Sequence, residues 1–153
     1  MDFEDISIVD FNDPDIENAW LQEMHKQVTQ YLGTQNVPLR KLDPAPAWHL
    51  SPITSIWAVE SQQEQGFIGW WAFAGDHPSD YISSQQASTP RDALQILAHE
   101  WQTFCQSLRS GKEDPKRYAG PPQDWPHVID TLEPRAATLI ELVRNDQLWT
   151  RNA

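Results

Sequence analysis

Apolar residues recur at every fourth position in the first part of the chain and predict an amphipathic helix. The apolar stripe consists of Ile16, Trp20, Met24, Val28 and Leu32. Asn12 or Asp13 can cap this helix, and Pro14 suits its first turn. Gly33 provides a stop. We therefore expect a helix from about residue 14 to residue 32.

Short apolar runs without helical spacing predict β-strands in the middle of the chain. Two runs are rich in β-branched and aromatic residues, ITSIWAVE at 53–60 and FIGWWAFA at 67–74. The polar stretch SQQEQG between them suits a hairpin loop. Several prolines exclude a helix between residues 33 and 52, where AWHL at 47–50 can form a short edge strand.

Helical spacing returns in the second half of the chain. Thr89 can cap a helix that begins at Pro90, with Asp92 as the acid of a capping box. Its apolar face comprises Ala93, Leu94, Leu97, Ala98, Trp101, Cys105 and Leu108. Because a proline inside a helix removes a hydrogen bond, Pro134 predicts two helices in the last region. We place these two helices at about residues 124–131 and about residues 132–145.

Together these elements predict an α+β protein in which three to four helices pack on a short antiparallel sheet of two to three strands. The length of 153 residues suits a single domain over residues 1–153, with an acidic and loosely held segment at 1–12. The adjacent Trp70 and Trp71 must point to opposite faces of their strand. Either helices cover both faces, or one face presents aromatic side chains to a ligand or a second copy.

The charge of the chain is strongly acidic and unevenly distributed. The net charge is −11 at pH 7, and no Lys or Arg lies between Lys41 and Arg91. Nucleic acid and anionic membranes bind dense basic surfaces, so we expect neither as a partner. The one basic cluster consists of Arg109, Lys112, Lys116 and Arg117 and is interrupted by two acids. We interpret it as a solvated helix end rather than as a binding patch.

Cysteine usage and hydropathy favour a cytoplasmic protein. Cys105 is the only cysteine, which excludes an internal disulfide and a zinc site built from several cysteines. Because Cys105 falls on an apolar helix face, we interpret it as an inert core residue. The N-terminal sequence MDFEDISIVD does not resemble a signal peptide, and no run approaches the ~20 apolar residues that a membrane helix needs.

Candidate chemistry is concentrated in GDHPSDYIS, residues 75–83, which follows the second predicted strand. Asp76, His77 and Asp80 can act beside Arg91, with Tyr81 packed underneath. A histidine near a carboxylate can serve as a general base. The two aspartates can also hold a hard divalent cation, although we expect no metal. The simpler interpretation is a structural turn in which both aspartates accept hydrogen bonds from backbone amides.

Other familiar catalytic and cofactor motifs are missing from the sequence. HEWQT at 99–103 has a threonine where the helix of a zinc peptidase has its second histidine. The six glycines are scattered and form no phosphate-binding loop, and no GxSxG nucleophile elbow occurs. We therefore expect no cofactor.

The run IGWWAFAGDHPSDYISSQQASTPRDALQILAHEWQ, residues 68–102, is similar to a family of small bacterial proteins known only as a domain of unknown function. The shared pattern is a strand with Trp, a G-D-x-P-[ST]-D-[YH]-I turn, a Pro-Arg helix start and a Trp late in that helix. The resemblance implies no activity. It includes Asp76, Pro78, Asp80 and Tyr81 in the pattern and gives His77 a variable position, which weakens the interpretation of His77 as a base.

The sequence thus favours a cytoplasmic, non-enzymatic binding or protein-interaction domain whose partner is another protein or a second copy in a homodimer. The candidate binding residues are Asp76, Asp80, Tyr81, Arg91, Trp70 and Trp71. The alternative is a small hydrolase or metal-dependent enzyme centred on residues 76–81, with His77 and Asp80 as catalytic candidates. An acidic imitator of nucleic acid, supported only by net charge, comes third.

Overall fold

Four antiparallel strands form the sheet of the described chain, in the sequence order β1-β2-β3-β4. The computed structural model describes residues 10–37, 42–114 and 116–150, so most of the predicted segment 1–12 lies outside the described residues. The strands are β1 (Trp48–Leu50), β2 (Thr54–Glu60), β3 (Ile68–Gly75) and β4 (His77–Ser83). The helices are α2 (Pro14–Thr34), α3 (Pro90–Arg109), the short 3-10 helix η1 (Pro122–Asp124), α4 (Trp125–Arg144) and α5 (Asp146–Thr150). The α+β class is as predicted, but the sheet has four strands instead of two or three.

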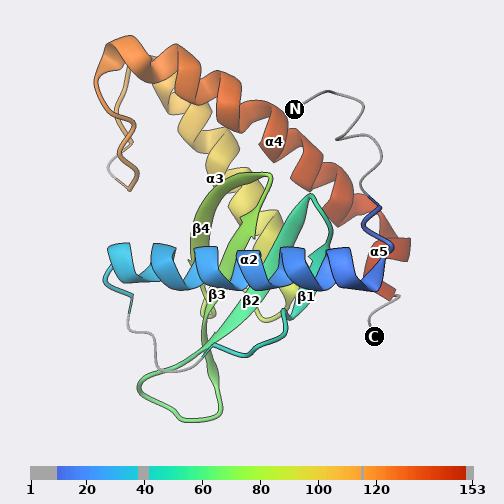
Figure 1. Ribbon diagram of the computed structural model, residues 1–153. Helices are drawn as coiled ribbons and strands as arrows, with labels where there is room; N and C mark the ends of the chain where they lie inside the picture. The colour runs from blue at the N-terminus through green and yellow to red at the C-terminus, as the bar shows by residue number, and fades with distance from the viewer. Residues whose placement is uncertain (1–9, 38–41, 115, 151–153) are drawn as a thin grey trace.

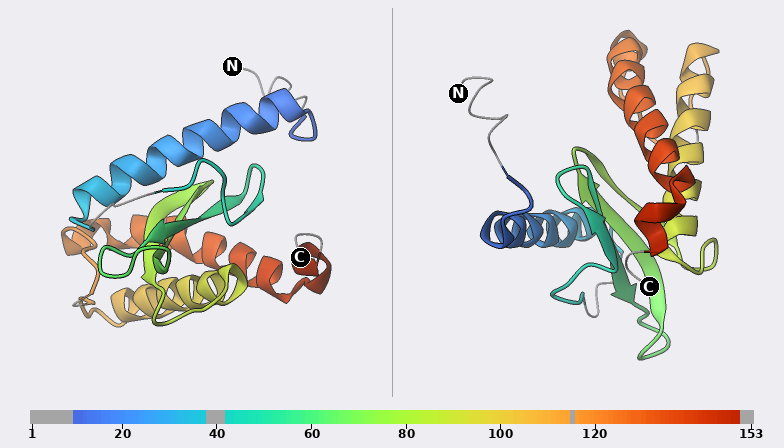
Figure 2. Two further views of the ribbon diagram at one scale, coloured as in Figure 1. Left: turned by 90° about the horizontal axis from the view of Figure 1, so that it is seen from below. Right: turned by 90° about the vertical axis from the view of Figure 1, so that its right-hand side faces the viewer.

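The sheet lies between two helical layers (Figures 1 and 2). Helix α2 crosses one face, while α3 and α4 pack together on the other face, as the right-hand view of Figure 2 shows. Among the described residues, no helix is both long enough and apolar enough to cross a membrane.

Each face of the sheet has its own hydrophobic core. Neighbouring residues on a strand point to opposite faces, so Ile56 and Trp57 belong to different cores. Trp71 is buried in the core under α3 and α4, and its neighbour Trp70 lies half-buried against the core under α2. Helices therefore cover both faces, which is the first of the two alternatives for the adjacent tryptophans.

Residues 77–83 form the strand β4, so the turn that we expected over segment 75–83 is confined to Asp76, between the paired Gly75 and His77. A Cβ atom on Gly75 would lie 2.2 Å from the carbonyl oxygen of Ile53. This position needs glycine because two backbone segments of the protein approach closely there. Pro78 and Asp80 suggested a turn, but β4 pairs with β3 alone and is an edge strand. A proline on an edge strand need not break a hydrogen-bond ladder, and charged side chains there discourage aggregation.

The helix starts follow the prediction, while one helix end differs. Asp13 caps α2 and Thr89 caps α3, each by accepting a hydrogen bond from a backbone N–H, at 2.9 Å and 3.1 Å. Helix α2 continues past Gly33 to Thr34. The left-handed backbone conformation that follows is adopted by Asn36, with φ of 55°, rather than by a glycine.

Helix α4 runs unbroken from Trp125 to Arg144, so the predicted division into two helices is wrong. Pro134 lies inside α4 and has no N–H to donate. The carbonyl that thereby loses its helical donor is that of Asp130, four residues earlier, and the guanidinium of Arg135 binds the next carbonyl, that of Thr131, at 2.9 Å. The buried face of α4 also packs in the core with α3 on both sides of the proline, and this packing outweighs the lost bond.

Candidate functional site

The centre of the candidate site is Asp80 on β4, which is only 6% exposed. Its Oδ1 accepts a hydrogen bond from the backbone N–H of Tyr81 at 2.8 Å. Its Oδ2 accepts one from Nε1 of Trp101 at 2.8 Å and another from the guanidinium of Arg117. Both carboxylate oxygens are therefore engaged, and one of the three donors is a backbone amide, as the sequence suggested.

Arg117 links β4 to α3 through two carboxylates. One end of its guanidinium binds Asp80, and the other donates to Oε2 of Glu100 at 2.9 Å. Burial alone would lower the pKa of Arg117, but the charges of Asp80 and Glu100 and the hydrogen bonds to them outweigh this effect and raise the pKa. The guanidinium therefore stays charged and holds the segment 116–118 beside β4.

A cleft of about 620 Å³ runs along the free edge of β4. Four consecutive residues, 80–83, line it. Because successive side chains on a strand point to opposite faces, all four can line one cleft only along the edge of the strand. The end of α2 forms one wall, while Glu100 and the segment 116–118 form the other. The volume lies within the range of roughly 300–1,000 Å³ that is typical of ligand sites.

Three rings on the α2 side of the cleft, Tyr31, Trp70 and Tyr81, form a surface that we call the aromatic wall. The ring centroid of Tyr81 lies 6.2 Å from that of Tyr31 and 5.5 Å from that of Trp70. Burial, and next the negative charge of Asp80, raise the pKa of Tyr31, so its hydroxyl stays neutral. The wall therefore offers apolar ring faces together with the neutral hydroxyl group of Tyr31.

The β3–β4 ladder determines which backbone groups of β4 point to this cleft. In an antiparallel ladder, hydrogen-bonded pairs alternate with non-bonded pairs. The N–H of Ser84 donates to the carbonyl of Gly69 at 3.0 Å, which makes this pair a bonded one. Counting back along the register, Ser83 and Tyr81 belong to non-bonded pairs. Their N–H and C=O groups therefore point away from β3, to the free edge.

Two of these four edge groups are already occupied. The N–H of Tyr81 donates to Asp80 at 2.8 Å, and the carbonyl of Ser83 accepts a hydrogen bond from the N–H of Gln86 at 3.0 Å. The carbonyl of Tyr81 and the N–H of Ser83 have no such partner within the described chain. The edge of β4 is thus partly closed and partly open.

His77 belongs to a local structural network. Its Nδ1 lies 2.8 Å from the carbonyl oxygen of Pro78, and its Nε2 lies 2.9 Å from Oγ1 of Thr54. Because a carbonyl only accepts, Nδ1 carries the proton and Nε2 accepts from the Thr54 hydroxyl. Burial lowers the pKa of His77, against the opposing effects of the Pro78 bond and of Asp76 and Asp80, so the ring is neutral in this network.

Asp76 does not join Asp80 in a cation site. Its side chain is 82% exposed and lies 4.0 Å from the guanidinium of Arg135, which also donates to the Asp76 carbonyl at 3.0 Å. The carboxylate of Asp80 is engaged by the guanidinium of Arg117. Among the residues that the structure describes, no three or more His, Cys, Asp or Glu side chains are grouped to hold a metal ion.

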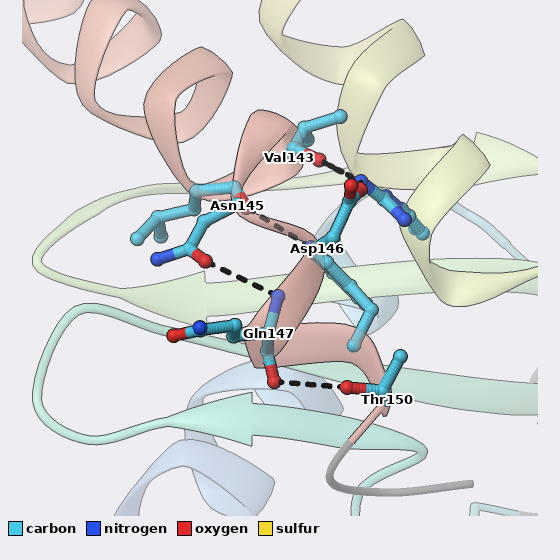
Figure 3. A network of polar contacts seen from close by, with 8 residues as sticks. Val143, Asn145, Asp146, Gln147 and Thr150 are labelled. Atoms are coloured by element: carbon cyan, nitrogen blue, oxygen red, sulfur yellow. Dashed lines mark hydrogen bonds and ion pairs between the residues drawn. The ribbon is translucent and has the colours of Figure 1, made fainter.

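Arg91 binds Val143 and Asp146 at the junction where α4 ends and α5 begins, away from the other candidates; Figure 3 shows this junction. It donates two hydrogen bonds to the carbonyl of Val143, at 2.9 Å and 2.7 Å, and one to Asp146 at 2.6 Å. Its guanidinium carbon lies 5.8 Å from the ring centroid of Trp149, which stacks on Trp48 at 4.0 Å. Arg91 therefore fixes α5 and does not line the cleft.

The two adjacent tryptophans differ in their access to the cleft. Trp71 is 3% exposed and donates its Nε1–H to the carbonyl of Ala87 at 2.9 Å, so it is a core residue. Trp70 is half-buried and lines the cleft. Of the six predicted binding residues, Asp80, Tyr81 and Trp70 come together, whereas Asp76, Arg91 and Trp71 lie elsewhere.

Arg117, Glu100 and Tyr31 contribute to the site but were missed in the sequence. Arg117 lies 37 positions from Asp80, in a cluster that we expected to be solvated. No local pattern pairs positions so far apart. Glu100 offered a usable signal, because a carboxylate that borders the buried face of a helix usually needs a cationic partner.

Comparison with known proteins identifies a family. Neither the curated proteins nor the solved structures contain a match to this chain. The family model of a domain of unknown function, DUF4826, matches residues 15–149, far beyond the run 68–102 that carried the resemblance. The matched range includes all of α2 except its first residue, the whole sheet, α3 and α4. The chain therefore belongs to the DUF4826 family.

Proposed function

We propose that this protein is a non-enzymatic binding domain that holds an extended segment of another protein along the free edge of β4. One observation carries the proposal: the floor of the cleft is the strand edge itself, with an open carbonyl at Tyr81 and an open N–H at Ser83. An extended peptide can add to such an edge as a further strand. Main-chain hydrogen bonds then give affinity, and flanking pockets give specificity.

The two walls of the cleft suit the alternating side chains of an added strand. One set of side chains would meet the aromatic wall of Tyr31, Trp70 and Tyr81, and the other set would meet Glu100 and Arg117. Aromatic rings and arginine are the residue types that most often dominate the energy of protein interfaces. The cleft therefore combines a backbone template with side chains that can select a sequence.

The charges in the cleft favour an uncharged ligand backbone. Asp80 and Glu100 carry two negative charges, and Arg117 and Lys116 carry two positive ones. Because these charges balance, the cleft has no net attraction for a strongly anionic or cationic small molecule. A peptide backbone is neutral and brings one donor and one acceptor per residue, which matches the open groups of the edge.

The alternative, a hydrolase or metal-dependent enzyme centred on residues 76–81, has weaker support. A general base needs a free lone pair within reach of the substrate. Both ring nitrogens of His77 are engaged, and the carboxylate of Asp80 already holds three donors. Catalysis by either residue would require these buried interactions to be broken first.

Random linear peptides displayed on phage and selected on the full chain test the proposal. Selected peptides should bind, and they should shift the backbone amide resonances of residues 80–86, of Tyr31 and of segment 116–118 in NMR spectra of the labelled protein. A selection that yields no specific binder, or binders that shift only resonances outside the cleft, would contradict the proposal.

A matched pair of variants at Ser83 shows whether the backbone edge is used. Ser83→Pro removes the open N–H and breaks no bond to β3, because Ser83 lies in a non-bonded pair. Ser83→Ala keeps this N–H and serves as the control. Ser83→Pro should weaken peptide binding about tenfold, the equivalent of one hydrogen bond, while Ser83→Ala should leave it within about twofold. Equal binding by both variants would argue against strand addition.

A further inference from the structure

We infer that the bound segment runs parallel to β4 and presents two apolar side chains, one residue apart, to the aromatic wall. This inference rests on the proposed function and adds the direction and the side-chain pattern of the ligand.

The direction follows from the edge groups that are already occupied. The N–H of Tyr81 is bound by Asp80 at 2.8 Å, and the carbonyl of Ser83 is bound by the N–H of Gln86 at 3.0 Å. Each of the two outward-facing residues therefore has one open group. Tyr81 offers its C=O alone, and Ser83 offers its N–H alone.

An antiparallel ligand strand does not fit this pattern. In antiparallel pairing, a bonded residue exchanges both its N–H and its C=O with a single partner residue. The N–H of Tyr81 is a single donor and is held by Asp80, and the carbonyl of Ser83 already accepts the bond that closes the turn to Gln86. The carboxylate of Asp80 is also held by Trp101 and Arg117, so releasing the Tyr81 N–H would disturb a buried network.

A parallel ligand strand uses the two open groups together. In a parallel ladder, one residue bonds to the residue before its partner and to the residue after it. With Ile82 as the partner, the ligand residue donates its N–H to the carbonyl of Tyr81 and accepts from the N–H of Ser83. Both bonds form without displacing any interaction of the free protein.

The same register sets which ligand side chains meet the aromatic wall. The ligand residue paired with Ile82 points to the side of Ile82, which is buried in the core under α3 and α4. The two neighbouring ligand residues point to the other side of the sheet. There they meet the rings of Tyr31, Trp70 and Tyr81. Apolar side chains at these two positions bury their surface against the rings.

The occupied groups also disfavour a second copy of the chain as the occupant of this edge. A two-fold symmetric dimer that continues the sheet through β4 would pair the two identical edges antiparallel. Antiparallel pairing is disfavoured here because the N–H of Tyr81 and the carbonyl of Ser83 already have hydrogen-bond partners. The occupant is therefore a segment of a different protein.

A nitroxide label on a phage-selected peptide tests the direction. The label is placed at the N-terminus of the peptide in one version and at the C-terminus in another, and the broadening of protein amide resonances is measured. The two reporter positions, Asp76 and Gln85, lie beyond opposite ends of β4 (His77–Ser83), a strand that spans roughly 20 Å at ~3.3 Å per residue. The N-terminal label should broaden Asp76, and the C-terminal label should broaden Gln85.

The reverse broadening pattern would overturn the parallel direction and leave the proposed function intact. Absence of any cleft-binding peptide would overturn both. Serine substitutions along the peptide test the side-chain pattern. Serine at either of two peptide positions that are separated by one residue should lower the affinity for the protein about tenfold, whereas serine at the residue between them should lower it less. Sensitivity at the middle residue alone would overturn the register.

Discussion

Within the part of the chain that the structure describes, two arginine–aspartate pairs lie beside tryptophan rings, and the two pairs differ in burial. At β4, the side chains of Arg117 and Asp80 are 23% and 9% exposed. At α5, those of Arg91 and Asp146 are 35% and 84% exposed, with a separation of 2.6 Å. In each pair the arginine binds a second acceptor, a carboxylate in the first and a backbone carbonyl in the second. Residue types therefore do not distinguish the pairs, but exposure to water does.

Exposure determines how strongly each partner depends on the other. Asp80 and Arg117 have lost most of their water, so removal of one leaves the other buried without compensation. Asp146 keeps most of its water, and a surface pair of this kind contributes little to stability. The pair at β4 thus supports the strand edge and the segment 116–118 that form the cleft, while the pair at α5 only helps to position a helix end.

The largest effect is expected from Asp80→Ala. Tyr81, Trp101 and Arg117 would all lose an acceptor, so the free energy of unfolding should fall by about 3–5 kcal/mol. Asp146→Ala removes the corresponding carboxylate of the exposed pair and should cost no more than about 1 kcal/mol. Urea unfolding followed by tryptophan fluorescence measures both losses.

Asp80→Asn separates the charge from the hydrogen bonds. The amide of asparagine keeps an acceptor oxygen but lacks the negative charge opposite Arg117. The loss in free energy of unfolding should therefore lie between the losses of Asp80→Ala and Asp146→Ala. Equal costs for the two alanine variants would show that burial does not govern the difference between the two pairs.

A smaller effect in the buried region is a dependence of stability on pH. Burial lowers the pKa of His77 below its ordinary value of 6.5. Below pH 6.5 the unfolded chain therefore binds a proton that the folded chain does not. The contribution of His77 to the free energy of unfolding should be complete above this pH. As the pH falls below 6.5, this contribution should decrease by at most about 1.4 kcal/mol per pH unit, until the folded-state pKa is reached. Urea unfolding across this pH range measures the slope.

A second histidine provides the control for this slope. His49 pairs with Glu17 at 2.9 Å, with side chains that are 29% and 36% exposed. His77→Gln should reduce the pH dependence, while His49→Gln should preserve the part that comes from His77. An unchanged slope in His77→Gln would assign the effect to other groups.

The elements that depend on local interactions could be predicted from the sequence, and the others could not. The starts of α2 and α3 follow from caps at Asp13 and Thr89, which act over a single turn. Strand β4 was missed because an edge strand tolerates the same proline and aspartate that local rules assign to turns. Helix α4 was divided at Pro134 because its packing on α3 outweighs the local cost of the proline.

The site was only half predictable for the same reason. Asp80 and Tyr81 stand out locally, because a carboxylate and an aromatic ring follow an apolar strand. Proximity in sequence favoured Arg91 as the cationic partner, but α3 carries Arg91 to the junction with α5. The actual partner, Arg117, comes from a segment without regular structure. A cleft between α2, an edge strand and such a segment has no signature in a single sequence.

A further prediction concerns Arg91 in the exposed pair. Arg91→Met removes the pair with Asp146, two hydrogen bonds to a carbonyl and the cation over Trp149. Water can replace part of these interactions, so the free energy of unfolding should fall by only about 1 kcal/mol. Arg91→Lys keeps the positive charge but not the planar guanidinium group, so its free energy of unfolding should fall by about half as much as that of Arg91→Met. A loss as large as that of Asp80→Ala in the same urea experiment would break the comparison.

The smallest effect on stability is expected for Tyr118, which lies next to Arg117, lines the cleft and is 90% exposed. Because this side chain buries little surface, Tyr118→Ala should change the free energy of unfolding by less than about 0.5 kcal/mol. Its ring is free to contact a ligand, so the same variant should weaken binding of a phage-selected peptide several-fold, as measured by calorimetry. Tyr118→Phe keeps the ring and should bind like the original protein.

Trp149, the ring beside the exposed pair, gives the matched contrast to Tyr118. It stacks on Trp48 at 4.0 Å and donates its Nε1–H to the carbonyl of Leu142 at 2.9 Å. Trp149→Ala should therefore lower stability but leave peptide binding unchanged, the opposite of Tyr118→Ala. If Tyr118→Ala destabilised the protein as much as Trp149→Ala, segment 116–118 would be part of the packed fold. If instead Tyr118→Ala left peptide binding unchanged, the ligand would not reach this wall of the cleft.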